Sequence, residues 1–203
     1  MAVYLFDQID EFSDDLFRRS LIRLSIERQK KATAYRQKID QKLSVLGCVL
    51  LNYGLKNEYG ITENITFSYL AKGKPFLTDY PQIHFNISHC QKAVICAIHT
   101  AEIGVDIETL AAYDAELAGY VCHDSELKLI KESDNKALAF TKIWTKKESL
   151  MKKTGVGLID QLRTIDSIDS EAIVLVDPGE AYVFSIAGMS FAELGLRTEL
   201  FKP

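Results

Sequence analysis

The sequence has few of the residues and segments that mark several protein classes. Its 203 residues include only four cysteines, Cys48, Cys90, Cys96 and Cys122, and no two are spaced as CxxC. This spacing indicates neither a zinc site nor a disulfide framework, and in a reducing compartment the four are most simply buried thiols. No stretch approaches the roughly 18 uninterrupted apolar residues of a membrane span, and the N-terminal MAVYLFDQIDEF is acidic where a signal peptide would be basic. We therefore expect a cytoplasmic protein with no membrane partner.

Other absences narrow the fold and the partners. There are only 4 prolines and 47% of the residues are hydrophobic, which suits one large globular domain or two small lobes. No internal repeat, low-complexity tract or obvious linker divides the chain. The net charge of -4 argues against a general nucleic-acid binder, so we expect no nucleic-acid partner.

One segment, residues 18–42, is strongly basic despite this net charge. Its only acidic residues are Glu27 and Asp40. Its basic residues are Arg18, Arg19, Arg23, Arg28, Lys30, Lys31, Arg36, Lys38 and Lys42. Such a run is either a solvated helix face or an anion-binding patch, which could serve a phosphate ligand or an acidic partner.

The order of the predicted elements favours an α+β fold. VYLFDQI predicts a strand, residues 13–54 have the spacing of two helices, and AKGKPFLTDYP has the composition of a loop after a short strand in ITENITFSYL. IHFNIS, KAVICAIHT and EIGVDIE then predict three strands in an antiparallel meander. Helical residues 114–154 precede the strand-like IVLV, AYVFSIA and LRTELF. Because strands and helices do not alternate, we expect α+β, with a lobe boundary near residue 101.

Two carboxylates in GVDIETL are unusual for a strand that only has to fold. Alternation places Ile103, Val105 and Ile107 on one face and Asp106 and Glu108 on the other. The Cα atoms of the two acids would then be roughly 6.5 Å apart, near enough for both carboxylates to bind one cation. The alternative is an ordinary exposed strand face.

Residues 136–153 predict a helix with charged residues at its core-facing side. Its apolar arc contains Ala137, Phe140, Ile143, Trp144, Leu150 and Met151. Lys147 falls inside this arc and Glu148 at its edge, so the helix should meet a polar site as well as a core. Glu148 and Lys152 could form a simple surface ion pair. Alternatively, Glu148 is a third metal ligand, and Lys147 and Lys152 hold phosphate charge. Together with Asp106 and Glu108, these residues suggest Mg²⁺-assisted phosphoryl chemistry.

Four blocks resemble, in order, the 4'-phosphopantetheinyl transferases of the longer type, which act on peptide-synthetase and other carrier proteins. The blocks are GKP (residues 73–75), FNISH (85–89), GVDIE (104–108) and WTKKESLMKKTGVGL (144–158). The resemblance covers residues 72–158 well and residues 30–51 faintly.

The resemblance implies transfer of the phosphopantetheine arm of coenzyme A to a serine of an apo acyl, peptidyl or aryl carrier protein. Adenosine 3',5'-bisphosphate would be released. By similarity, Asp106, Glu108 and Glu148 would bind Mg²⁺, and Glu148 would also deprotonate the serine. Lys152 would support the charge on the leaving group. The residues that the resemblance places around the coenzyme A phosphates are Lys74, Ser88, His89, Arg28, Lys31 and Lys42.

The resemblance also implies two similar α+β lobes related by a pseudo-twofold axis, each an antiparallel sheet packed with a long helix. We expect them at residues 1–101 and 102–203, with the active site at their junction and a monomeric protein. The chain departs from the family at Leu43, Gln91 and Val156, so its anion contacts should be redistributed.

Two functions from other classes stay open. A Mg²⁺-dependent phosphodiester hydrolase would also use paired acids and lysines. A non-catalytic module could bind acidic partners through residues 18–42. A hydrolase triad is disfavoured because Ser88 and His89 are adjacent in a strand and point to opposite faces.

Overall fold

The computed structural model describes residues 2–155 and 162–197. The first half contains β1 (Ala2–Phe6), α1 (Asp14–Leu21), α2 (Ile26–Thr33), α3 (Lys38–Tyr59), β2 (Phe67–Tyr69), β3 (Pro75–Leu77), β4 (His84–His89) and β5 (Val94–His99). The second half contains β6 (Gly104–Thr109), α4 (Ala115–Val121), α5 (Asp124–Glu132), α6 (Lys136–Thr154), β7 (Ile173–Val176), β8 (Tyr182–Ala187) and β9 (Leu196–Arg197). Three short 3-10 turns lie at Ile9–Glu11, Leu162–Thr164 and Phe191–Glu193.

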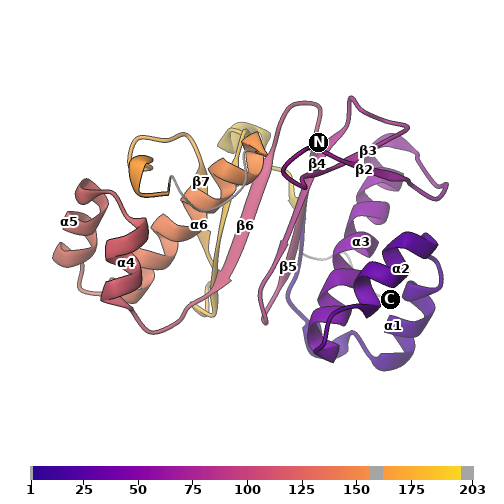
Figure 1. The fold of residues 1–203 in the computed structure, drawn as a ribbon, viewed down its shortest axis with the longest axis horizontal. Coiled ribbons are helices and arrows are strands. Elements are labelled where there is room, and N and C mark those ends of the chain that lie inside the picture. The colour runs from indigo at the N-terminus through magenta and orange to yellow at the C-terminus, as the bar shows by residue number, and fades with distance from the viewer. Residues whose placement is uncertain (1, 156–161, 198–203) are drawn as a thin grey trace.

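The elements form four layers, with two sheets between two long helices (Figure 1). The first sheet has the strand order β4-β5-β1-β9, and the second has the order β6-β8-β7. Helix α3 covers the outer face of the first sheet, and α6 covers the outer face of the second. Strands β2 and β3 form a separate hairpin at the end of the first lobe.

The two faces of β1 show how alternation builds the two main cores. Tyr4 and Phe6 pack with α3 in the core of the first lobe. Val3 and Leu5 point the other way and pack with residues of β6 and β8. Every residue of β1 is buried because the strand has a neighbouring layer on each side. The core between the sheets therefore joins the lobes into one body.

The first lobe contains three helices where the helical spacing predicted two. Ser13 and Ser25 begin α1 and α2, because their side chains accept hydrogen bonds from the backbone N–H groups of Leu16 and Arg28. These N-caps were the available signals for separate helices. Helix α3 continues to Tyr59, past the predicted end at residue 54, and stops at Gly60 with a φ of 70°. The loop predicted for residues 71–81 contains the short strand β3.

The predicted antiparallel meander of three strands is wrong for its third member. Strands β4 and β5 pair as expected, but the other neighbour of β5 is β1. The backbone hydrogen bonds of β5 are thus used on both sides, and β6 finds its partner in β8 of the second sheet. Residues 100–103 carry the chain from one sheet to the other, which sequence adjacency cannot reveal.

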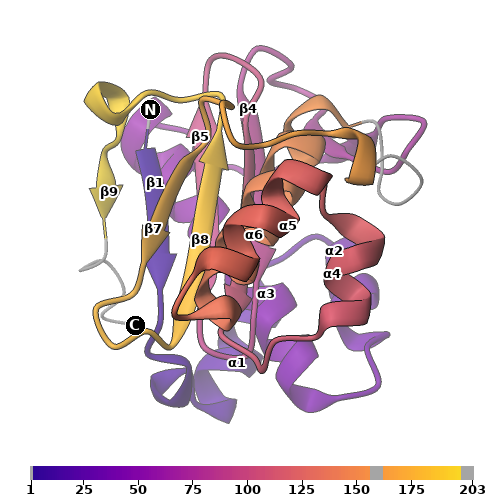
Figure 2. The ribbon, with the colours of Figure 1, turned by 90° about the vertical axis from the view of Figure 1, so that its left-hand side faces the viewer.

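The predicted α+β class is confirmed, and each lobe has a sheet with one long helix. The second sheet is antiparallel throughout. The first sheet is antiparallel except at its edge, where β9 runs parallel to β1, as Figure 2 shows. Strand β9 lies within the predicted strand LRTELF, of which residues 198–201 are outside the described part. None of the described helices combines the length and apolar character that crossing a membrane requires.

Candidate active site

Asp106 lies between β6 and α6, at the junction of the two lobes. Its neighbours Val105 and Ile107 are in the core between the sheets, so alternation turns Asp106 toward the helix. Asp106 is only 2% exposed. Across the ladder it pairs with Ser185, whose hydroxyl is 2.7 Å from the Thr145 hydroxyl on α6. A polar layer therefore separates helix from sheet here, and Asp106 lies within it.

The Asp106 carboxylate is held by two donors from different elements. Its Oδ1 accepts hydrogen bonds from the Ser88 hydroxyl of β4 at 3.0 Å and from the Lys152 ammonium of α6 at 2.5 Å. Its Oδ2 is buried and has no partner among the described residues. A buried carboxylate oxygen without a donor is costly. This atom therefore fits a ligand position for a cation.

Glu108 and Glu148 share the electrostatic environment of Asp106. Burial, and next the negative charge of Asp106, raises the pKa of Glu148 to about 7. Burial and then Asp106 likewise raise the pKa of Glu108, whereas a hydrogen bond from Trp144 opposes this shift. Converging carboxylates that disfavour one another's ionisation are what a bound cation relieves.

The three carboxylates are nevertheless not arranged as a finished metal site. Within residues 2–155 and 162–197, no three acidic, histidine or cysteine side chains form a group that could hold a metal ion. The Lys152 ammonium instead occupies the position beside Asp106. The charge balance and the unpartnered Asp106 Oδ2 fit a cation, while Lys152 contacts the other carboxylate oxygen, Oδ1.

Helix α6 lies very close to β6 because the residues in contact have small side chains or none. A Cβ at Gly104 would be 2.1 Å from the Ser149 carbonyl oxygen and 2.3 Å from the Lys153 backbone nitrogen. Thr145 and Ser149 are fully buried against the sheet. The prediction that the apolar arc of α6 faces the main core is therefore wrong in part. Apart from Met151 its residues are only half-buried, and several of them pack with α4 and α5.

Lys147 does not join the carboxylates, although the sequence suggested that it could hold phosphate charge. It is 1% exposed and forms a buried ion pair with Glu126, which is fully buried in α5. Glu126 also accepts hydrogen bonds from the backbone N–H of His123 at 2.7 Å and from Ser167. All the charge of Lys147 is therefore used to attach α5 and the segment at Ser167 to α6.

A pocket of about 170 Å³ brings together three of the residues suggested for coenzyme A phosphates, Arg28, Lys31 and His89. The Arg28 guanidinium lies 2.9 Å from the Cys48 sulfur and 5.4 Å from the centre of the Phe67 ring. The Lys31 ammonium lies 5.0 Å from the centre of the Tyr69 ring. Burial and the nearby Lys152 lower the pKa of His89. The pocket thus offers two cations, and its His89 lies close enough to Asp106 and Lys152 to be influenced by their charges.

The other suggested phosphate ligands lie elsewhere. Lys42 pairs with Asp14 at 2.8 Å and does not line this pocket. The Lys74 ammonium donates to the carbonyl oxygens of Ile103 and Lys153, which fixes the end of α6, and burial lowers its pKa. The Ser88 hydroxyl donates its hydrogen bond to Asp106 and not to a pocket ligand.

The three residues that depart from the family pattern lie in three different surroundings. Leu43 is buried and lines the pocket. The turn before β5 forms through a hydrogen bond from Cys90 N–H to Ala93, and Gln91 does not require positive φ there. Val156, with the end of the fourth motif, is outside the described residues.

Comparisons with known proteins cover most of the chain. Residues 102–182 match the family model of the 4'-phosphopantetheinyl transferase superfamily, and residues 12–101 match the model of the 4'-phosphopantetheinyl transferase N-terminal region. The chain belongs to the 4'-phosphopantetheinyl transferase superfamily. The two matches meet between residues 101 and 102, where the chain passes from the first sheet to the second.

Two bacterial relatives show how much of the chain is matched. It is 35% identical to 4'-phosphopantetheinyl transferase Sfp of Bacillus subtilis over 138 residues, which are 66% of this chain and 62% of the relative. It is 33% identical to 4'-phosphopantetheinyl transferase gsp of Aneurinibacillus migulanus over 156 residues, 74% of this chain and 65% of the relative. The chain thus spans less than two thirds of these two relatives.

Sequence reasoning missed two residues that shape the site of this superfamily member. Glu126 follows His123 at the spacing of a capping box, a signal that could have placed it at the start of a helix but not in a buried ion pair. The Asn86 side chain accepts a hydrogen bond from Val105 N–H at 2.8 Å, which joins β4 to β6. Its position on the polar face of a predicted strand gave no indication of this contact.

Proposed function

We propose that this protein transfers the 4'-phosphopantetheine arm of coenzyme A to a serine of an apo carrier protein. The observation that carries the proposal is the carboxylate cluster around Asp106, which lies beside the cationic pocket of Arg28 and Lys31 at the lobe junction. An anionic diphosphate substrate needs both features, cations for its phosphates and carboxylates for a metal and a proton. The membership of the superfamily supports the same reaction.

The residues present fit Mg²⁺ as cofactor. Asp106, Glu108 and Glu148 would hold it, since hard oxygen ligands suit this ion and Asp106 Oδ2 is unpartnered among the described residues. The bound ion would neutralise charge on the diphosphate of coenzyme A. Lys152, which contacts the other oxygen of Asp106, would then contact a phosphate.

In the proposed reaction the serine oxygen attacks the phosphorus that carries the pantetheine arm. The bond from this phosphorus to the bridging oxygen breaks, and adenosine 3',5'-bisphosphate leaves. Glu148 accepts the serine proton, a role that suits a carboxylate whose pKa is raised to about 7. The Lys152 ammonium stabilises the negative charge that develops on the leaving group.

The nucleotide end of coenzyme A would lie in the pocket of Arg28, Lys31 and His89. The guanidinium of Arg28 is positioned by Cys48 and Phe67 before any ligand binds, which lowers the entropy cost of binding a phosphate. Ser88 would remain a positioning residue for Asp106. Lys42 and Lys74 would need to leave their present partners to contact a phosphate.

We further propose that one chain is sufficient for activity and that the protein acts as a monomer in the cytoplasm. Both lobes contribute to the site, Ser88 and Arg28 from the first and Asp106 and Glu148 from the second. The proposed carrier is an acyl, peptidyl or aryl carrier protein.

The decisive experiment incubates the protein with coenzyme A, Mg²⁺ and an apo carrier protein, and then weighs the carrier by mass spectrometry. The expected result is a mass increase equal to one phosphopantetheine group, together with release of the bisphosphate. Turnover of a nucleotide or nucleic acid without a carrier would support the hydrolase alternative instead. If Asp106 and Glu148 can be replaced without loss of function, the non-catalytic alternative holds.

A further inference from the structure

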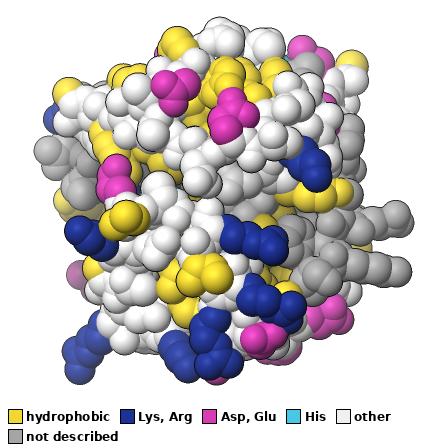
Figure 3. All heavy atoms as spheres, turned by 90° about the vertical axis from the view of Figure 1, so that its right-hand side faces the viewer, with side chains coloured by type: hydrophobic (Ala, Val, Ile, Leu, Met, Phe, Trp, Pro, Cys, Tyr) yellow, Lys and Arg dark blue, Asp and Glu magenta, His cyan; other side chains and the backbone are white. Residues whose placement is uncertain are grey.

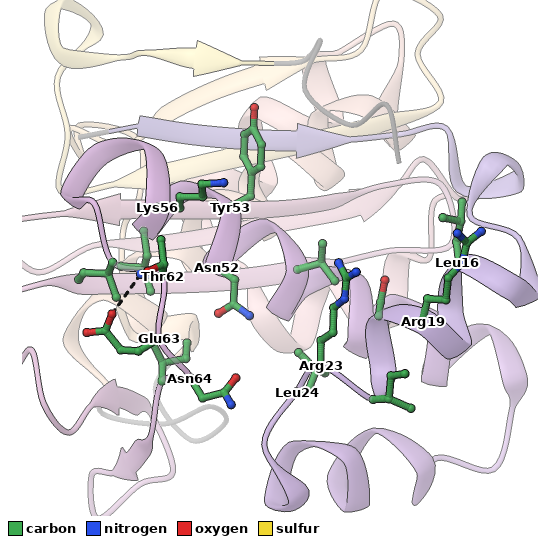
Figure 4. Close-up of a pocket in the computed structure, with 16 residues that line it drawn as sticks. Leu16, Arg19, Arg23, Leu24, Asn52, Tyr53, Lys56, Thr62, Glu63 and Asn64 are labelled. Atoms are coloured by element: carbon green, nitrogen blue, oxygen red, sulfur yellow. Dashed lines mark hydrogen bonds between the residues drawn. The ribbon is translucent and has the colours of Figure 1, made fainter.

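A large cavity lies away from the carboxylates, entirely within the first lobe. It is a groove of about 840 Å³, open to solvent, and we call it the α1–α3 groove. Figure 4 shows it between Arg19 and Arg23 on one side and residues 62–64 on the other, with Asn52 of α3 between them. No residue named in the proposed reaction lines it.

The floor of the groove is one face of α3, on which the Tyr53 ring also contacts Tyr4 of β1 at 5.7 Å between ring centres. Val49, Asn52, Tyr53 and Lys56 line it at the spacing i, i+3, i+4 and i+7, which is one face of a helix. These positions extend over about 10 Å, or two helical turns. Leu16 of α1, with Leu24, Ile61 and Ile65, adds apolar walls.

The rim of the groove has an excess of positive charge. Arg19, Arg23 and Lys56 line it, against the single carboxylate of Glu63. Arg19 pairs with Asp15, and Glu63 already accepts a hydrogen bond from Tyr80. Arg23 and Lys56 form no ion pair with any residue that the structure describes. Figure 3 shows Lys and Arg side chains gathered with apolar ones on this side of the molecule.

The shape and chemistry of the groove favour a helix over an extended peptide. Its walls are two helices and a loop, and they offer no free strand edge to which an extended chain could add. An amphipathic helix needs only an apolar floor and complementary charges at the rim.

We propose that the α1–α3 groove is a docking site for an acidic amphipathic helix of a protein partner. The apolar face of the helix packs on Val49 and Tyr53, and its Asp or Glu side chains pair with Arg23 and Lys56. Docking here leaves the lobe junction open. The proposal does not depend on the transfer reaction, because it concerns a separate surface and is tested by binding alone.

A synthetic helix tests the proposal directly. The probe is a fluorescein-labelled, helix-stapled peptide of roughly four turns, with Leu along one face and Glu on both flanks. Fluorescence anisotropy measures its affinity for the full chain. The double variant Arg23→Glu/Lys56→Glu is compared with Lys30→Glu/Arg36→Glu, which makes the same charge change at two exposed residues outside the groove.

We expect the groove variant to weaken binding at least about tenfold, because two attractive charge contacts at the rim become repulsive. The control variant should change it less than about threefold, since exposed charges at a distance are screened by salt. A peptide with Lys in place of Glu should recover binding to the groove variant only. Replacing the Leu face by Ser should abolish binding.

Three results would overturn the proposal. One is equal weakening by both double variants, which would show general surface attraction. Another is the absence of saturable binding, with circular dichroism confirming that the variants and the wild type are folded. The third is displacement of the peptide by decanoate, which would identify the groove as a site for a small amphiphilic anion.

Discussion

The two long helices, α3 and α6, cover equivalent faces of the two sheets but do so with opposite chemistry. Helix α3 packs on the first sheet through leucines, among them Leu46, Leu50 and Leu51. Helix α6 packs on the second sheet through Thr145, Ser149 and the carboxylate of Glu148. One interface is a hydrophobic core, and the other is a polar layer.

Each helix–sheet interface has one glycine at its closest approach, and the two glycines lie on different elements. In the first lobe Gly54 is on the helix, and an added Cβ would meet side chains, Ile98 at 2.4 Å and Tyr4 at 2.6 Å. In the second lobe Gly104 is on the strand, and its Cβ would meet backbone atoms of α6. The first interface is built for stability and can adjust its side chains, whereas the second fixes the backbone that carries Glu148 and Lys152.

The largest expected effect is that of Asp106→Ala in the polar layer. We expect loss of transfer activity by more than about 10³-fold, because the variant lacks the central carboxylate and leaves Lys152 and Ser88 without their shared acceptor. Its circular dichroism spectrum should match that of the wild type. Retained activity with an unchanged metal requirement would place the site elsewhere.

Glu148→Gln separates the two duties proposed for that carboxylate. Because the amide keeps one ligand oxygen but is not basic, kcat should fall by about 10² to 10⁴ with little change in the Mg²⁺ concentration for half-maximal rate. The measurement is a rate series over Mg²⁺ concentration. Rescue to near wild-type turnover by excess Mg²⁺ would show that metal binding, and not base catalysis, is the main role.

The two glycines provide a matched pair for the comparison of the lobes. Gly104→Ala should displace α6 and lower kcat by about 10²-fold, the effect of roughly 1 Å of misplacement. Gly54→Ala should instead cost about 1–3 kcal/mol of stability through overpacking and leave kcat unchanged. Thermal melting and kcat per folded molecule should be measured for both. Similar kcat values for the two variants would contradict the assigned difference.

The smallest expected effect belongs to the first lobe and concerns substrate binding. Removing Arg28 and Lys31 together by substitution with Ala should raise KM for coenzyme A about tenfold and change kcat little, because a remote phosphate contact is mostly uniform binding. Dephospho-coenzyme A serves as the control substrate. If the variant still distinguishes the two substrates as well as the wild type does, these residues do not bind the 3'-phosphate.

The sequence predicted the features that depend on local spacing and missed those that depend on a neighbouring layer. Alternation in β6 correctly placed Val105 and Asp106 on opposite faces. The arc on α6 was misassigned because the helix has two contact surfaces, and a hydrophobic arc detects only the apolar one. Lys147 could not be assigned from spacing, since its partner Glu126 is 21 residues away and on another helix.

The parallel pairing of β9 with β1 has a consequence for synthesis on the ribosome. Strand β1 is synthesised well before its neighbour on one side, which is formed by Leu196–Arg197. Until those residues leave the exit tunnel, one edge of β1 is unpaired and open to another chain. The first lobe therefore cannot complete its sheet during translation of its own residues, and the nascent chain depends on β9 for protection against misassembly.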